Sequence, residues 1–111
     1  MKIYFKTRRL EKICNHQKES NKIIGPTMAK KLRQRLFELK AAESLKDISR
    51  LPPARCHQLS GNRHNQFSVD LEHPYRLLFI PANEPLPTLE DGGLDLKKIT
   101  EIVIIEITDT H

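Results

Sequence analysis

The order of apolar and polar positions divides the chain into a helical first half and a sheet-forming second half. Residues 2–5 predict a short strand, and residues 15–25 are polar enough to predict a loop. Between them, residues 7–14 predict a short helix, because their apolar positions fall on one helical face: Leu10, Ile13 and Cys14.

A long helix is predicted next, over residues 28–50. Gly25 and Pro26 punctuate the chain, and a proline is well tolerated in the first turn of a helix. Apolar residues then recur every three or four positions: Met28, Leu32, Leu36, Leu39, Ala42 and Leu45. Basic residues fall mainly off this stripe, and Pro52-Pro53 cannot continue the helix.

The second half of the chain predicts a sheet. Residues 66–72 alternate between apolar and polar, residues 75–80 predict a second strand, and residues 72–75 turn the chain between them. Residues 81–98 hold three prolines and two glycines, which indicates a long loop. Residues 99–108 predict a strand that lies centrally and is buried on both faces in its middle. Helices followed by a largely antiparallel sheet predict a single α+β domain covering residues 1–111.

Composition excludes several classes of protein. The chain has 111 residues and no apolar run of the roughly 18 residues that a membrane span needs. Polar and basic residues near the start do not fit a signal peptide. Its two cysteines match no CxxC motif or disulfide framework, so we expect a reduced, cytoplasmic setting. A metal site built on Cys56, His57 and His64 lacks tetrahedral ligand spacing, and no cofactor motif is present.

The charge of the chain is unevenly distributed. The net charge is +5, but residues 1–63 carry 16 Lys and Arg against 5 Asp and Glu, a net +11. Residues 64–111 carry 3 against 9, a net −6. This asymmetry indicates a polyanion as one partner and a second partner elsewhere, although a solvated helix face explains basic stretches equally well.

Residues 55–79 and 106–111 carry a family resemblance. A histidine precedes a Leu-x-Gly turn, and a basic residue, an aromatic-Ser strand and a strand with an arginine follow: His57, Leu59-Ser60-Gly61, Arg63, Phe67-Ser68 and Arg76. The chain ends on Asp109-Thr110-His111. This set resembles the RelE/ParE superfamily of toxins, and its HigB branch in particular. The chain departs from the family at Thr110, where the family has Tyr, and in its longer 81–98 loop.

The resemblance implies a metal-independent cleavage of messenger RNA in the ribosome. The RNA 2′-hydroxyl attacks the adjacent phosphate, which needs a base, an acid and positive charge. The family pattern implies catalytic roles for His57, Arg76, Asp109 and His111. Either histidine can transfer a proton, Asp109 can orient a histidine or act as a base, and Arg76 can hold phosphate oxygens. Asp109 and His111 share strand parity, so both can point at one site.

Other basic residues are expected to bind RNA phosphates. Arg63 and Arg55 flank the histidine motif, and Lys30 and Arg33 lie on the predicted long helix. We expect the outer face of that helix, including Lys31 and Arg35, to contact ribosomal RNA. The resemblance also implies a small HigA-like helix-turn-helix antitoxin as partner, besides messenger RNA and the ribosome.

Each candidate residue also has a purely structural interpretation. Arg76 can simply pair with Asp70 or Glu72 across the hairpin, and Arg63 can be a solvated loop charge. His111 is terminal, and chain ends usually fray. Two other functions remain open on the same fold: a ParE-like poison that binds a topoisomerase and cleaves nothing, and an inert binding module.

Overall fold

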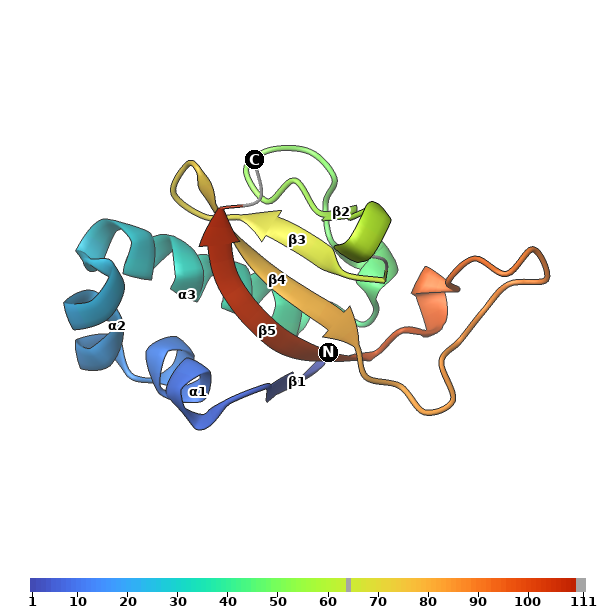
Figure 1. Ribbon diagram of the computed structural model, residues 1–111, viewed down its shortest axis with the longest axis horizontal. Helices are drawn as coiled ribbons and strands as arrows, with labels where there is room; N and C mark the ends of the chain where they lie inside the picture. The colour runs from blue at the N-terminus through green and yellow to red at the C-terminus, as the bar shows by residue number, and fades with distance from the viewer. Residues whose placement is uncertain (64, 110–111) are drawn as a thin grey trace.

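The computed structural model describes residues 1–63 and 65–109 as an α+β fold, in which a helical layer packs on a mixed sheet (Figure 1). The helices are α1 (Arg8–Asn15), α2 (Gln17–Ile24) and α3 (Pro26–Ala41). The strands are β1 (Lys2–Phe5), β2 (His57–Gln58), β3 (Phe67–Asp70), β4 (Tyr75–Pro81) and β5 (Glu101–Asp109). Short 3₁₀ turns lie at Leu45–Asp47 (η1), Gly61–Arg63 (η2) and Leu96–Lys98 (η3).

The five strands are ordered β1-β5-β4-β3-β2. β1 pairs with β5 in parallel, whereas the other three pairings are antiparallel. The predicted hairpin is confirmed: β3 and β4 are joined by a tight turn in which the Tyr75 N–H donates to the Glu72 carbonyl over 2.8 Å. The two edge strands, β1 and β2, are among the shortest of the five.

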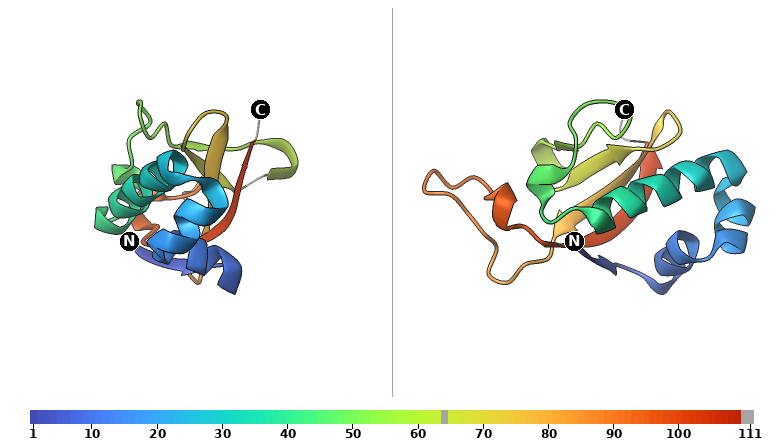
Figure 2. Two further views of the ribbon diagram at one scale, coloured as in Figure 1. Left: turned by 90° about the vertical axis from the view of Figure 1, so that its left-hand side faces the viewer. Right: turned by 180° about the vertical axis from the view of Figure 1, so that it is seen from behind.

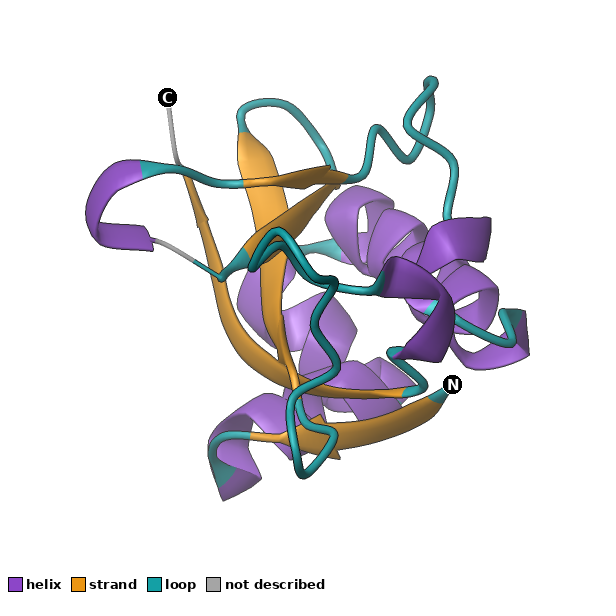
Figure 3. Ribbon diagram, turned by 90° about the vertical axis from the view of Figure 1, so that its right-hand side faces the viewer, coloured by secondary structure: helices purple, strands orange, loops and turns teal. Residues whose placement is uncertain are grey.

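The core lies between one face of the sheet and the helices. Seen from behind, α3 runs across the sheet (Figure 2), and a view from the side shows the α-helices grouped against one face of the strands (Figure 3). Leu32 and Leu39 of α3 are fully buried and belong to the same core cluster as Leu77 and Phe79 of β4. The predicted apolar face of α1 is buried as well.

Two predictions about the helices are wrong. Residues 17–24 form α2 rather than a loop, although Ser20 is their only residue that the structure buries. α3 ends at Ala41 rather than near residue 50, because Ala42 adopts an extended conformation. Ser44 and Asp47 then form a capping box that starts η1, so Leu45 reaches the core from a separate turn.

The last strand also differs from the prediction. Ile102 and Ile104 of β5 are fully buried, but Val103 and Ile105 are only half-buried, so one face of the strand is buried rather than two. A register shift opposite Leu78 and Phe79 places an extra residue in β5. After this bulge, β5 remains paired with β4 but runs on beyond the end of β1.

Residues 82–98 form an extension that projects from the end of the sheet (Figure 1). Thr88 and Leu94 form an isolated bridge, and the Leu89 N–H donates to the Gly93 carbonyl over 2.7 Å. The predicted loop therefore contains a small hairpin. Within the described residues, no helix is both long and apolar enough to cross a membrane.

Candidate functional site

The face of the sheet that turns away from the helices carries most of the candidate residues. Side chains alternate between the two faces of a strand, and Phe67, Leu77 and Phe79 belong to the core on the helical side. Ser68 and Asp70 of β3 and Arg76 of β4 therefore point to the opposite face. His57 reaches the same face, because its ring contacts Ser68.

His57 is exposed but is held by a buried hydroxyl. It pairs with Ser68 in the register of β2 and β3, and its Nδ1 lies 3.3 Å from the Ser68 Oγ. Ser68 is fully buried. A side-chain hydrogen bond at Nδ1 orients the ring and leaves Nε2 directed to solvent, where it can exchange a proton with a bound ligand.

Arg76 and Arg55 converge on the carboxylate of Asp70. The Arg76 Nε lies 3.2 Å from Asp70 Oδ1, and the Arg55 Nε lies 3.6 Å from Oδ2. Arg76 lies opposite Asp70 across the β3–β4 hairpin. The structural interpretation, in which Arg76 pairs with Asp70, is therefore confirmed. The Arg76 side chain is 19% exposed, whereas that of Arg55 is 61% exposed. These three residues also line a small cleft of about 140 Å³, so an anion there can meet both guanidinium groups.

Arg35 is buried, which corrects the expectation that it contacts RNA. It projects inward from α3, where its Nε donates to the Asp70 backbone carbonyl over 2.8 Å and its Nη1 donates to Glu38 over 3.2 Å. The sequence does not indicate that Arg35 lies on the buried face of α3, because a charged guanidinium interrupts the apolar stripe. Arg35 thus fixes the backbone of Asp70 from the helical side, while Arg76 and Arg55 hold its carboxylate on the other.

Arg63 stands at the same face, next to β5. Its Nη1 lies 3.5 Å from Glu106 Oε2 and 3.4 Å from Gln66 Oε1. Both Arg63 and Glu106 are partly exposed, at 38% and 46% of their side-chain surface. No pattern in the sequence indicated the role of Glu106, because its partner is 43 residues away.

Asp109, the C-terminal candidate that the structure describes, lies apart from this group. Asp109 pairs in register with Tyr75, while its neighbour Thr108 pairs with Arg76. Alternation therefore assigns Asp109 to the side of the sheet opposite Arg76. The strand register, which the sequence alone does not reveal, thus does not support the expectation that Asp109 shares a site with His57 and Arg76. His111 and Thr110 lie outside the described residues.

Lys30, Lys31 and Arg33 are exposed on α3, as the sequence predicts. They lie on the helical layer, however, whereas His57, Arg55, Arg63 and Arg76 lie across the sheet. The basic residues therefore form two separate surfaces. A single phosphate cannot contact both.

The two cysteines are not suited to chemistry. Cys14 and Cys56 are buried and form no disulfide. Burial raises the pKa of the Cys14 thiol to about 12 and that of Cys56 to about 11, the latter against a smaller lowering effect of Arg50. Neither forms a thiolate at neutral pH. Within residues 1–63 and 65–109, no group of three or more His, Cys, Asp or Glu is arranged to hold a metal ion.

This face of the sheet thus combines one oriented imidazole with several guanidinium groups, which are the kinds of group that bind a phosphodiester and transfer its protons. Comparison with known proteins gives the family. Residues 3–87 match the family described as the RelE-like toxin of the type II toxin–antitoxin system HigB. The chain belongs to this family of HigB-like toxins.

The match runs from Ile3, within β1, to beyond the end of β4 of this HigB-like toxin, and it includes His57, Arg63 and Arg76. β5 and most of the 82–98 extension lie beyond the matched residues. Comparison with curated protein sequences gave no significant match. The family and the α+β fold agree with the resemblance seen in the sequence, and a type II toxin implies an antitoxin partner.

Proposed function

We propose that this HigB-like toxin is a ribosome-dependent endoribonuclease that inhibits translation by cleaving messenger RNA. One observation carries the proposal: His57 is exposed, is oriented by the buried Ser68, and lies on the same face of the sheet as Arg55, Arg63 and Arg76. An oriented proton-transfer group beside several fixed cations meets the needs of phosphodiester cleavage.

The reaction needs no outside nucleophile. The RNA 2′-oxygen forms a bond to the adjacent phosphorus while the bond from phosphorus to the 5′-oxygen breaks. The proton of the 2′-hydroxyl passes to a base, and a proton from an acid reaches the leaving 5′-oxygen. The products are a 2′,3′-cyclic phosphate and a free 5′-hydroxyl. No Lewis acid is required, because guanidinium groups can stabilise the negative charge of the transition state.

We assign the roles as follows. His57 transfers one of the two protons through Nε2, since Ser68 engages Nδ1. Arg76 binds the scissile phosphate, and its ion pair with Asp70 keeps its guanidinium in place. Arg63 and Arg55 bind neighbouring phosphates, and His111 is our candidate for the second proton transfer. Asp109 is given no direct step, because the strand register assigns it to the other face.

Reporter messages in a translating extract provide the test. We expect the purified toxin to cut a translated message and to leave the same RNA intact when ribosomes are absent. Equal cutting with and without ribosomes would overturn ribosome dependence. Intact messages in both, together with gyrase-dependent DNA damage in expressing cells, would favour the ParE-like function. Intact messages without such damage would favour an inert binding module.

We further propose that a HigA-like antitoxin with a helix-turn-helix domain neutralises the toxin. The family implies an antitoxin, and the domain is small and highly charged. Co-expression with the product of the adjacent reading frame should relieve growth arrest, and the two proteins should co-purify and repress their own promoter. If toxicity persists and the proteins do not co-purify, this partner is excluded.

A further inference from the structure

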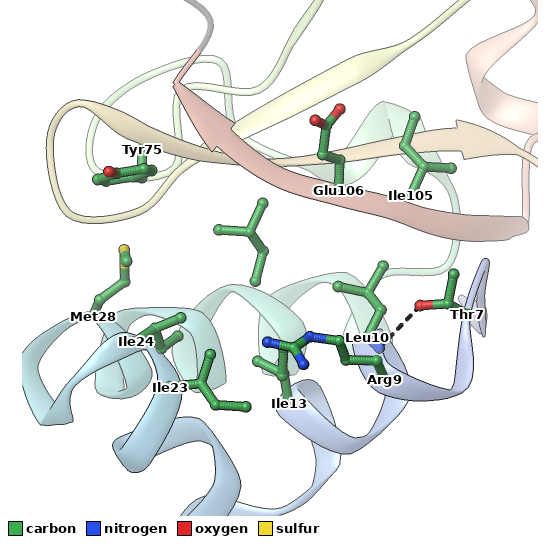
Figure 4. Close-up of a pocket in the computed structure, with 11 residues that line it drawn as sticks. Thr7, Arg9, Leu10, Ile13, Ile23, Ile24, Met28, Tyr75, Ile105 and Glu106 are labelled. Carbon is green, nitrogen blue, oxygen red and sulfur yellow. Dashed lines mark hydrogen bonds between the residues drawn. The ribbon is translucent and has the colours of Figure 1, made fainter.

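A groove separates the helical layer from β5 (Figure 4). Its volume is about 490 Å³, and apolar side chains from α1, α2, α3 and β5 form most of its lining: Leu10, Ile13, Ile23, Ile24, Met28 and Ile107. Ile23 is 40% exposed and Tyr75, at one end of the groove, is 43% exposed. The lining is therefore open to solvent, and a continuous apolar surface of this kind marks an interaction site in many proteins.

One wall of the groove is an unpaired strand edge. β1 pairs with residues 101–104 of β5, and after Lys6 the chain leaves the sheet toward α1. In the part of the chain that the structure describes, no strand pairs with residues 105–108 on this side, although β4 pairs with them on the other. A strand directs alternate backbone groups to each side, so this edge offers N–H and C=O groups to an added strand.

The helices that form the opposite wall are rich in basic residues. Residues 6–31, which include α1, α2 and the start of α3, carry eight Lys and Arg against two Asp and Glu. Arg9 itself lines the groove. Glu106 also contributes to the lining, but its carboxylate projects away from the helices in Figure 4 and pairs with Arg63. The electrostatic complement of this wall is an acidic segment.

We propose that an extended, acidic and partly apolar segment of the antitoxin binds here by adding a strand to β5. Its backbone pairs with residues 105–108, one set of its side chains enters the groove, and its carboxylates lie near Arg9. At roughly 3.3 Å per residue, the edge accommodates a segment of about four to six residues. The proposal rests on the toxin–antitoxin function.

Because of where this segment binds, neutralisation and catalysis use different surfaces of the toxin. β5 and β1 form one side of the sheet, whereas β2, which carries His57, is the strand at the other edge. A segment bound along β5 therefore leaves the face of His57 and Arg76 uncovered. Variants of the groove are expected to escape the antitoxin and to keep their toxicity.

The test uses the full-length toxin and the protein encoded beside it, with two readouts. The first is amide hydrogen exchange of the wild-type toxin, alone and in the complex. The second is the affinity of Ile23→Glu and Arg9→Glu, which place acidic groups in the groove. Leu86→Glu and Lys18→Glu are matched controls, because Leu86 is 38% exposed on the 82–98 extension and Lys18 is an exposed cation that does not line the groove.

We expect the complex to protect amides within residues 105–108. We also expect Ile23→Glu and Arg9→Glu each to weaken binding by roughly tenfold or more, as for residues at the centre of an interface, with the controls unchanged. Cleavage of messages by both groove variants should match the wild type.

Three results would overturn the proposal. The first is a complex in which the amides of residues 105–108 exchange as fast as in the free toxin. The second is that the groove variants bind the antitoxin as tightly as the control variants do. The third is that the toxin and the antitoxin form no complex. These three results do not concern message cleavage, so the enzymatic function would still stand if the toxin cut messages. Conversely, a toxin that binds the antitoxin but does not cut messages would refute the enzymatic function alone.

Discussion

Asp70 links the fold to the proposed site at the scale of single residues. Its backbone carbonyl accepts from the buried Arg35, and its carboxylate meets Arg76 and Arg55 on the other side of the sheet. One residue thus fixes the backbone of β3 and orients two guanidinium groups. An arginine held in this way loses little side-chain freedom when it binds a phosphate.

Replacing Arg76 separates its structural role from its catalytic one. We expect Arg76→Ala to slow message cleavage by roughly a hundred- to a thousandfold, as when a transition-state donor is removed. Removing the cross-strand pair should lower the free energy of unfolding by only about 0.2–1 kcal/mol. Arg76→Lys should recover part of the rate, because an ammonium cannot donate as a planar fork.

Cleavage rates in extract and denaturant unfolding check this prediction. Arg8→Ala is the matched control, since it removes an exposed arginine on α1 that is far along the sequence from the proposed site. If Arg76→Ala cuts at the wild-type rate, Arg76 serves the hairpin only.

The buried thiols predict a pH dependence of stability. Burial raises the pKa of Cys56 to about 11 and that of Cys14 to about 12, above the ordinary value of 9.0. The folded state therefore retains these protons more strongly than the unfolded state. Their contribution is complete below pH 9 and is lost as the pH rises toward 11 and 12.

Denaturant unfolding from mildly to strongly alkaline pH, across the ordinary thiol pKa of 9.0, measures this effect. The free energy of unfolding should fall with rising pH, and Cys56→Ala should show a smaller decline than the wild type. Equal declines in the two proteins would show that Cys56 does not contribute.

At the scale of elements, the sequence predicts the features that depend on the local spacing of apolar residues. The α1 face and the β3–β4 hairpin follow from residues that lie near each other in the sequence. Three features give no such local signal. α2 buries only Ser20 and lacks an apolar stripe, β2 has two residues, and β1 pairs with β5, which lies at the other end of the described chain.

The sequence likewise predicts only part of the candidate site. The family pattern indicates His57, Arg63 and Arg76 as candidates, and the structure places these three residues on one face of the sheet. Ser68 was part of the motif, but its contact with His57 required the strand register. The same register assigns Asp109 to the other side, which no spacing along the chain reveals.

The outer face of α3 is proposed as a second surface that binds ribosomal RNA. Lys30→Glu combined with Arg33→Glu should weaken ribosome binding and reduce its salt dependence, by close to one power of salt for each phosphate that the helix no longer neutralises. Both side chains are exposed, so the fold should be intact. The double variant Lys97→Glu and Lys98→Glu, on η3, is the matched control.

Sedimentation with ribosomes over a range of salt concentrations measures the change. Unaltered affinity and slope in the α3 variant would exclude this helix as a ribosomal contact. An equal loss in the η3 control would indicate a general effect of net charge.

At the scale of the whole molecule, we propose that three separate surfaces serve the functions of this HigB-like toxin. The sheet face with His57 and Arg76 is proposed for the reaction, α3 for the ribosome, and the groove beside β5 for the antitoxin. The uneven charge of the sequence corresponds to this division. Basic residues lie mainly on the helices and in the segment before β3, while several acidic residues gather on the 82–98 extension.

The chemistry of the cut ends tests the central claim most directly. Reporter message is incubated with wild-type toxin or with His57→Ala in a translating extract, and a message with a 2′-deoxynucleotide at the cut position serves as control. We predict 2′,3′-cyclic phosphate and 5′-hydroxyl ends from the wild type, cleavage roughly a hundred- to ten-thousandfold slower for His57→Ala, and no cut at the deoxynucleotide. Cutting of the deoxy message, 5′-phosphate ends, or an unchanged rate for His57→Ala would contradict the account.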